Sequence, residues 1–289
     1  MCSNEHRHAC RRNNKGTTMI NNECPEWRYG DLEAVVFDWA GTTVDFGCQG
    51  PLEAFVESFA AFGVDVTRTE AREPMGMKKR DHVAAMFAMP RIARMWQEHH
   101  GAPHDEHDID TVYALVEETM IAVIRRHSVP IPGTLEAVAE LRRLGLRIGS
   151  CTGYPRVVAE LLAERAKEFG YEPDVLVCAT DVPAGRPAPD MCKEVLARLG
   201  IADPARAVKI GDTVNDVLEG LHAGMWVIGL TLSGSLAGLS QEEIAALSPE
   251  DREALHHRIS HTLTTAGAHF TAVDVQSCLP LLQEIEKRS

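Results

Sequence analysis

The sequence lacks any long run of uncharged apolar residues. A membrane-spanning helix needs roughly 20 such residues in succession, and no stretch of the 289-residue chain approaches that length. Residues 1–12 also lack the apolar core of a signal peptide. These two absences predict a cytoplasmic protein that makes no membrane contact.

Basic residues are too few for a protein that binds polyanions. The chain has 29 Lys and Arg against 42 Asp and Glu, which gives a formal net charge of −13. This charge repels a nucleic-acid backbone, so the sequence predicts no nucleic-acid partner. A small anionic substrate would need positive charge gathered at its binding site.

The cysteines have neither the density of a disulfide scaffold nor a repeated metal-ligand spacing. We therefore expect reduced thiols, several of them buried. The first 31 residues are polar and have no apolar periodicity, so residues 1–31 are predicted to be a disordered extension. The eight cysteines are Cys2, Cys10, Cys24, Cys48, Cys151, Cys178, Cys192 and Cys278.

From Leu32 onward, short apolar and β-branched runs alternate with segments of helical period. This alternation is typical of an α/β protein, here a Rossmann-like, doubly wound parallel sheet. The expected strands are Ala34–Asp38, Arg147–Cys151, Val175–Thr180, Val208–Asp212 and Trp226–Thr231. The expected helices are Thr134–Leu144, Arg156–Phe169, Pro189–Leu199 and Val214–His222, followed by structural segments at Gln241–Leu247, Pro249–Ile259, Phe270–Val273 (an apolar run) and Val275–Lys287.

Residues 47–127 break the alternation, because they show three amphipathic helical patterns and no convincing strand. The patterns are Leu52–Phe59, His82–Trp96 with an interruption at Pro90, and Val112–Ile124. A helical block between the first and second strands predicts an inserted, all-helical cap domain over the carboxyl edge of the sheet. The catalytic core would then comprise residues 32–46 and 128–289.

Four motifs whose residues could take part in catalysis or ligand binding fall at the ends of predicted strands. These ends meet at one edge of a parallel sheet. The first is Asp38, within FDWAGTTVD (Phe37 to Asp45), whose carboxylate can act as a nucleophile. Asp212 and Asp216, in the motif GDTVND, could join Asp38 around Mg²⁺. The structural alternative is that Asp38 caps a turn and Asp212 caps a helix.

The other two motifs suit a phosphoryl group. Thr152 and Gly153 precede a predicted helix, so a hydroxyl and backbone amides can cradle phosphate at the positive helix end. Arg186 offers a permanently charged fork for the same group. The alternative for Thr152 and Gly153 is an N-cap that binds no ligand, and the alternative for Arg186 is an ordinary surface arginine.

These motifs resemble the haloacid dehalogenase superfamily and, more narrowly, the phosphonoacetaldehyde hydrolase (phosphonatase) family. The resemblance covers nearly everything from Leu32 onward. It rests on DWAGTTVD, GC followed by Pro51, PMG-x-x-K-x-DH (Pro74 to His82), SCTGY (Ser150 to Tyr154), DVPAGRPAP (Asp181 to Pro189) and AGMWVIG (Ala223 to Gly229). It implies Mg²⁺-dependent hydrolysis of 2-phosphonoacetaldehyde to acetaldehyde and phosphate.

The resemblance also implies roles for individual residues. Asp38 matches the nucleophile that becomes an aspartyl phosphate, and Lys79 matches the lysine that forms a Schiff base with the aldehyde. The metal ligands would be the side chains of Asp38 and Asp212 and the backbone carbonyl of Ala40. Cys48 and Tyr154 match positions that line the family's site. A homodimer that meets through the caps is implied as well, and the apolar stripe at Leu52–Phe59 permits it.

Ala40 supports this assignment on chemical grounds. Superfamily phosphatases and mutases usually carry a second Asp there, which protonates a departing oxygen. Alanine cannot donate a proton, whereas a protonated imine on Lys79 can accept the electron pair left on carbon when a carbon–phosphorus bond breaks. The alternatives are a 2-haloacid dehalogenase, a phosphate-ester phosphatase and a non-catalytic binding protein.

Lys79 must be neutral to attack a carbonyl, yet at a reference pKa near 10.4 only about 0.04% is neutral at pH 7. Lys78, Arg80 and closure of the cap are expected to lower its pKa. A helix through this segment would place Met75, Lys79 and His82 on one face, with His82 able to shuttle protons and Met75 able to pack beside the imine. Lys78 is the local rival, and Met77-Lys78 replaces two residues that are apolar in the family pattern.

Overall fold

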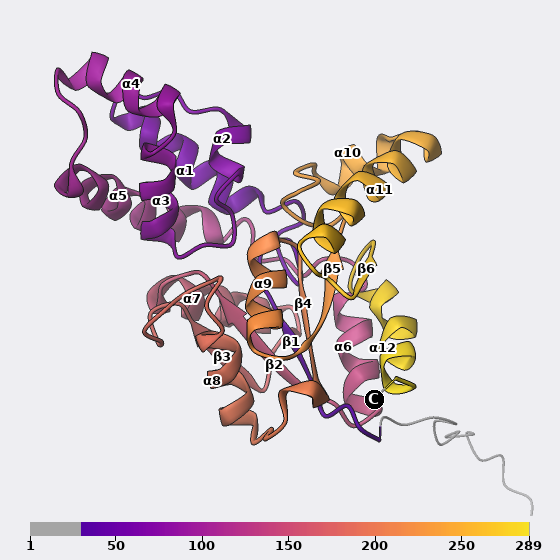
Figure 1. The fold of residues 1–289 in the computed structure, drawn as a ribbon. Coiled ribbons are helices and arrows are strands. Elements are labelled where there is room, and N and C mark those ends of the chain that lie inside the picture. The colour runs from indigo at the N-terminus through magenta and orange to yellow at the C-terminus, as the bar shows by residue number, and fades with distance from the viewer. Residues whose placement is uncertain (1–29, 289) are drawn as a thin grey trace, which may run out of the picture.

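Six strands form a single parallel sheet in the order β3-β2-β1-β4-β5-β6 (Figure 1). The computed structural model describes residues 30–288, so most of the predicted extension, residues 1–29, lies outside the described residues. The strands are β1 (Ala34–Phe37), β2 (Arg147–Thr152), β3 (Val175–Cys178), β4 (Ala207–Gly211), β5 (Trp226–Leu230) and β6 (Phe270–Ala272).

The sheet confirms the predicted Rossmann-like α/β class. Phe37, the last residue of β1, pairs with Ser150 of β2 and with Ile210 of β4. The three central strands therefore end close together, and the loops that follow them share one edge. All four residues of β1 are buried, because helices cover both faces of the sheet.

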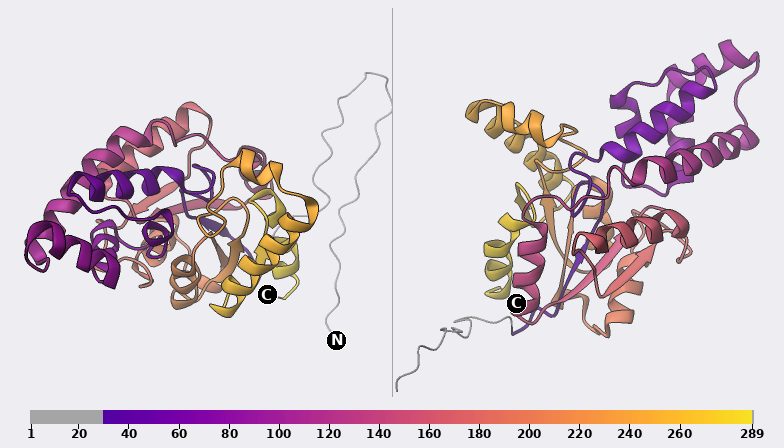
Figure 2. Two further views of the ribbon diagram at one scale, coloured as in Figure 1. Left: turned by 90° about the horizontal axis from the view of Figure 1, so that it is seen from above. Right: turned by 180° about the vertical axis from the view of Figure 1, so that it is seen from behind.

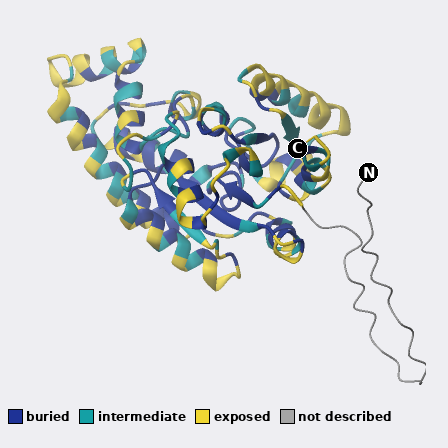
Figure 3. Ribbon diagram, turned by 60° about the horizontal axis from the view of Figure 1, so that its bottom comes forward, coloured by how far each residue is buried: buried dark blue, intermediate teal, exposed yellow. Residues whose placement is uncertain are grey.

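Side chains alternate between two cores on either side of the sheet. Val35 and Phe37 face the core that contains α6 (Thr134–Arg143), α7 (Arg156–Glu168) and α12 (Leu279–Glu286). Ala34 and Val36 face α8 (Asp190–Leu199). The same face of the sheet also carries α9 (Val214–His222) and α11 (Pro249–Thr265). Figure 3 shows buried strands inside helices whose outward faces are exposed.

A group of five helices is inserted between β1 and α6 and stands beside the sheet (Figures 1 and 2). Its members are α1 (Gln49–Ala61), α2 (Arg68–Arg72), α3 (Lys79–Phe87), α4 (Pro90–His100) and α5 (Glu106–Ile124). Leu52, Phe55 and Phe59 of α1 are completely buried, and α1 packs on α5. The apolar stripe predicted to permit dimer contact is thus used inside this helical group.

The interruption expected at Pro90 within His82–Trp96 is confirmed, because Pro90 begins α4. Other element predictions need correction. The pattern Val112–Ile124 starts earlier, at Glu106, where Asp105 forms a capping box with Asp108. The apolar run Phe270–Val273 contains the edge strand β6. The closing helix is divided into a 3₁₀ turn, Gln276–Cys278, and α12.

The remaining elements are short or peripheral. A 3₁₀ turn, Pro204–Arg206, precedes β4, and α10 (Gln241–Ala246) precedes α11. Among the described residues, no helix combines the length and apolar character that a membrane crossing requires. The five cysteines within residues 30–288 are free and buried, as expected, whereas Cys2, Cys10 and Cys24 lie outside the described residues.

Candidate active site

Asp38 lies immediately after β1, in a turn that aims its carboxylate into the crevice at the sheet edge. Its backbone N–H donates to the carbonyl of Ile210, and the hydroxyl of Thr43 donates to its carbonyl. Gly41 has a φ of +84°, and a Cβ at this position would come within 2.7 Å of Asp212 Oδ2. Glycine is therefore required for the turn to pass so close to that carboxylate.

An inner chamber of about 20 Å³ lies beside Asp38. It collects all the predicted site residues except His82 and Asp216. Its walls come from the loops after β1, β2, β3 and β4 and from the helical insertion, which confirms that the four motifs converge. The chamber is lined by Asp38, Ala40, Cys48, Pro51, Met75, Gly76, Lys79, Thr152, Gly153, Tyr154, Arg186, Asp212 and Thr213.

Three carboxylates beside the chamber form a set that fits a hard cation. One oxygen each from Asp38, Asp212 and Asp216 lies within 4.8 Å of the others. Burial, together with repulsion from the other two carboxylates, raises the pKa of Asp212 to about 7. Ser235 donates from its N–H and its hydroxyl to Asp212, over 2.6 and 2.7 Å, and holds it in place. Oxygen ligands with excess negative charge are what Mg²⁺ prefers.

Arg186 lies beneath the chamber and bridges three carboxylates. Its Nη2 lies 2.8 Å from Asp38 Oδ1, its Nη1 lies 3.1 Å from Asp216 Oδ1, and its Nε lies 2.7 Å from Glu219 Oε2. The side chain is 1% exposed, which excludes the alternative of an ordinary surface arginine. The guanidinium of Arg186 thus contacts Asp38 and forms part of the chamber wall.

Two charged residues behind Arg186 were not predicted. Lys209 and Glu219 are fully buried, and Lys209 Nζ lies 3.3 Å from Glu219 Oε2 and 3.0 Å from Asp216 Oδ1. Cys151 Sγ accepts from Lys209 Nζ over 3.1 Å. A signal existed in the sequence: a lysine in the apolar run of β4, and a glutamate on the face of α9 that carries Asp216.

Lys79 is the first residue of α3 and is 6% exposed. Its ammonium makes no hydrogen bond or ion pair with the described residues, and its neighbours include the rings of Tyr154, with the centroid at 4.8 Å, and Phe55, at 5.6 Å. Burial lowers the pKa of Lys79 from its usual value. Burial is the largest cause, and the cation that contributes is Arg186, whereas Lys78, Arg80 and closure of the cap were expected to lower this pKa.

The predicted helical face of Met75, Lys79 and His82 is wrong, because α3 begins at Lys79 and Met75 lies in the preceding turn. Met75 still lines the chamber. His82 does not: its Nε2 contacts the carbonyl of Ala71 at 2.9 Å, and its ring stacks on Phe55 with centroids 3.8 Å apart. This position favours a packing role for His82 over proton transfer.

The remaining chamber residues supply neutral polar groups. Burial raises the pKa values of the Cys48 thiol and the Tyr154 phenol, so both stay protonated at neutral pH. The buried Tyr154 hydroxyl has no partner among the described residues. Thr152 accepts a hydrogen bond from the N–H of Tyr154 over 3.3 Å, which fixes the turn before α7.

Comparison with known proteins agrees with this geometry. The sequence model of the haloacid dehalogenase-like hydrolase family matches residues 32–224. A protein of Bacillus cereus named phosphonoacetaldehyde hydrolase is 45% identical over 257 residues, which cover 89% of this chain and 97% of that protein. This chain belongs to the phosphonoacetaldehyde hydrolase family. It is a hydrolase, and the alternative of a non-catalytic binding protein is set aside.

A further relative and two solved structures are also similar to this chain. A phosphonoacetaldehyde hydrolase-like protein of Syntrophobacter fumaroxidans is 48% identical over 258 residues, covering 89% of this chain and 93% of its own. The crystal structure of a phosphonoacetaldehyde hydrolase-like protein from Oleispira antarctica superimposes with a TM-score of 0.88 at 37% identity, over 91% of this chain and 95% of that one. A putative β-phosphoglucomutase from Bacteroides vulgatus, at 21% identity and a TM-score of 0.63, shares the fold.

Proposed function

We propose that this chain hydrolyses the carbon–phosphorus bond of 2-phosphonoacetaldehyde to acetaldehyde and phosphate. The observation that carries the proposal is that a carboxylate, Asp38, and a buried amine, Lys79, line one chamber. Ala40 lines it too, at the position where a phosphatase would need an acid. The names of the family members quoted above support the same substrate.

The first step is condensation of the Lys79 amine with the aldehyde. The neutral nitrogen attacks the carbonyl carbon, and loss of water leaves a protonated imine. The lowered pKa of Lys79 favours the neutral amine that this attack needs. The protonated Tyr154 phenol, whose hydroxyl is otherwise unpartnered, can donate a hydrogen bond to the substrate.

The second step transfers the phosphoryl group to Asp38. Its carboxylate oxygen attacks phosphorus, the carbon–phosphorus bond breaks, and the electron pair moves through carbon onto the imine nitrogen to give an enamine. Arg186, 2.8 Å from Asp38, supplies fixed positive charge where the phosphoryl oxygens gather. No acid is required for a departing oxygen, which agrees with alanine at residue 40.

Two hydrolyses complete the cycle. Protonation of the enamine carbon regenerates an imine, which water cleaves to acetaldehyde and the free Lys79 amine. A second water attacks phosphorus of the aspartyl phosphate, which releases phosphate and restores Asp38. Imine formation releases one water, and the two hydrolyses consume one each, so the net reaction uses a single water.

We assign the metal as Mg²⁺, held by Asp38, Asp212 and the backbone carbonyl of Ala40, with Asp216 behind them. When bound, it would neutralise the repulsion between the nucleophile and the phosphonate. The cluster of carboxylates supports this assignment, because one oxygen each from Asp38, Asp212 and Asp216 lies within 4.8 Å of the others. A 2-haloacid dehalogenase would need neither this cation nor Lys79.

Access to the chamber requires movement. A volume of about 20 Å³ accommodates about one water molecule, so the substrate enters only when the helical insertion moves away from the sheet edge. The turn before α3 is held on the core by Asn215, which donates to the carbonyl of Met75 over 2.9 Å. We therefore treat residues 47–127 as a mobile cap on the core formed by residues 32–46 and 128–289.

A phosphate-release assay with three substrates tests the proposal. Phosphonoacetaldehyde should release phosphate rapidly with Mg²⁺. p-Nitrophenyl phosphate and acetyl phosphate should be poor substrates, because neither carries an aldehyde that Lys79 can hold as an imine. EDTA should stop the reaction. Faster release from p-nitrophenyl phosphate than from phosphonoacetaldehyde would identify an ester phosphatase instead.

We also propose a homodimer, as the family resemblance suggests, and a cytoplasmic location. Because the Leu52–Phe59 stripe is buried within the cap, the dimer contact must use other residues. Sedimentation equilibrium of the full chain measures the assembly directly, and a monomer at micromolar concentration would contradict it.

A further inference from the structure

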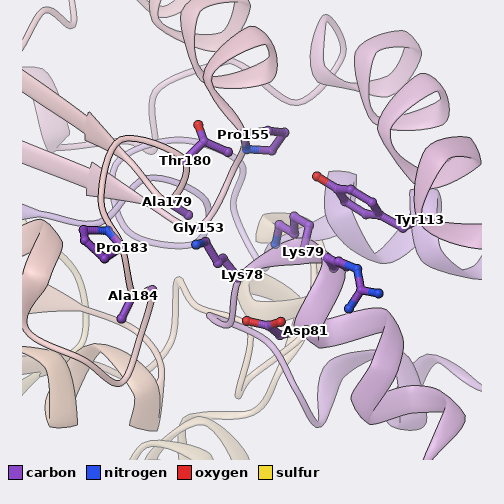
Figure 4. A pocket seen from close by; sticks show the side chains of 12 residues that line it. Lys78, Lys79, Asp81, Tyr113, Gly153, Pro155, Ala179, Thr180, Pro183 and Ala184 are labelled. Carbon is purple, nitrogen blue, oxygen red and sulfur yellow. The ribbon is translucent and has the colours of Figure 1, made fainter. Parts of the chain in front are cut away.

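A second and larger cavity, of about 560 Å³, opens outside the inner chamber. The two share Lys79 and Gly153 as lining residues, so the outer cavity is the space next to the chamber on the side of the cap. Figure 4 shows its two walls: the start of α3 on the cap, and the loops around Gly153 and Ala179–Ala184 on the core.

Lys78 lines this outer cavity with its charged side chain. It is half-buried, and it makes no ion pair or hydrogen bond within residues 30–288. Its side chain extends toward the core loop (Figure 4). Gly185 permits this approach, since a Cβ there would come within 3.0 Å of Lys78 Cγ.

The other charges in the cavity differ from Lys78 in their surroundings. Arg80 is held by Glu106 and Asp110, each at 2.7 Å, so its charge is compensated at the surface. Lys79 is nine-tenths buried, without an ionic partner, and is aimed into the inner chamber. Asp81, which lines the same cavity, carries a negative charge that would repel an anion there. The N-termini of α3 and α7, both without a side-chain cap, add partial positive charge from either wall.

We propose that the outer cavity is an anion-binding antechamber, centred on the Lys78 ammonium, that receives a tetrahedral phosphorus oxyanion before it enters the inner chamber. On the proposed function, on which this inference rests, that anion is the phosphonate group of the substrate, with inorganic phosphate as the product that leaves by the same route. A chain with a net charge of −13 needs such a local reversal of sign to attract a dianion.

Lys78 attracts the anion electrostatically and forms no covalent bond with it. The anion has left Lys78 by the time it reacts, so loss of Lys78 should slow the capture of substrate, which raises KM and leaves kcat within about twofold. Lys79, the neighbouring amine that reacts, should behave oppositely and control kcat. The adjacent pair therefore distinguishes a binding lysine from a reacting one.

The experiment measures KM and kcat with phosphonoacetaldehyde, and Ki for inorganic phosphate, in wild type, Lys78→Met, Asp81→Asn and Lys193→Met. Lys193 is an exposed lysine on α8 and controls for net charge. At about 20 mM ionic strength we expect Lys78→Met to raise KM and Ki about five- to tenfold, and Asp81→Asn to lower both. At about 0.5 M the differences should shrink to about twofold.

The outcomes distinguish failure of the antechamber from failure of the proposed function. If KM and Ki of Lys78→Met match those of Lys193→Met, the antechamber is wrong. A collapse of kcat in Lys78→Met also overturns it, because Lys78 would then belong to the reacting groups. If wild type releases no phosphate, the proposed function fails, and the antechamber is judged on phosphate binding by ³¹P line broadening, which Lys78→Met should weaken and Lys193→Met should not.

Discussion

Arg186 donates from Nε to Glu219 Oε2 over 2.7 Å, in a region where both side chains are at most 1% exposed. A guanidinium is planar and rigid, so fixing Nε also fixes the directions of Nη1 and Nη2. These two nitrogens contact Asp216 and Asp38, the proposed nucleophile. Glu219 is thus a positioning residue for the fork, and Lys209 balances its charge.

We predict that Glu219→Gln lowers kcat/KM about 10- to 100-fold, because a small displacement of Arg186 misaligns charge at the reacting phosphoryl group. Steady-state kinetics with phosphonoacetaldehyde measure the effect. Glu219→Gln should also be less stable than wild type, because it leaves Lys209 with less compensation.

A double variant separates positioning from stability. Lys209→Met/Glu219→Gln removes both charges of the buried pair, so its Tm should return toward the wild-type value. Its kcat/KM should stay low, because Arg186 still lacks its ionic anchor. Recovery of kcat/KM together with Tm would mean that the pair only stabilises the fold.

Asp38→Asn should reduce phosphate release by at least about 1000-fold, as expected for loss of a nucleophile. The variant keeps the side-chain shape, and its circular dichroism should match that of wild type. Release within tenfold of wild type would exclude an aspartyl-phosphate route.

Lys79→Arg should also block phosphate release, although it keeps a positive charge. A guanidinium remains protonated and cannot form the imine. The assay is again phosphate release from phosphonoacetaldehyde, with Lys78→Arg as the matched control, which should retain turnover. An active Lys79→Arg enzyme would indicate hydrolysis without covalent attachment of the aldehyde.

The lowered pKa of Lys79 predicts a specific pH dependence. Imine formation needs the neutral amine, so the rate should fall about tenfold per pH unit below the pKa of Lys79 and level off above it. Acetaldehyde is a suitable probe because it has no titratable group, and cyanoborohydride trapping at Lys79 gives the rate. The plateau should begin below pH 10.4, the usual value for lysine. A rate that still rises above pH 10.4 would contradict this prediction.

Metal binding should appear in stability as well as in activity. Because Asp38, Asp212 and Asp216 repel one another, Mg²⁺ should raise Tm in wild type, and EDTA should reverse the change. Asp212→Asn removes one of the repelling charges, so without metal it should be at least as stable as wild type, while its Tm should not respond to Mg²⁺. Equal Mg²⁺ responses in both proteins would place the cation elsewhere.

The sheet and the order of the motifs could be predicted because they depend on local pattern. The five predicted strands each match an observed strand to within two residues at either end. Asp38, Thr152, Arg186 and Asp212 meet because parallel strands place their carboxyl ends at one edge. The inward direction of Lys79 could not be read from a run of three basic residues, and it entered through the family resemblance.

The rest depended on tertiary contacts that the sequence does not state. Lys209 and Glu219 act as a pair only because β4 and α9 pack together, and neither residue has a local motif. His82 was expected in the site from helical spacing, but the helix begins at Lys79, and the histidine is packed against Phe55. Edge strand β6 was missed as a strand because it has only three residues.

In the proposed mechanism, Lys79 holds the substrate through an imine while Asp38 accepts the phosphoryl group. Borohydride reduction during turnover of phosphonoacetaldehyde, followed by peptide mass spectrometry, tests it most directly. We expect a reduced two-carbon adduct on Lys79 and none on the adjacent Lys78, with irreversible loss of activity. An adduct on another residue, or full activity after reduction, would contradict it.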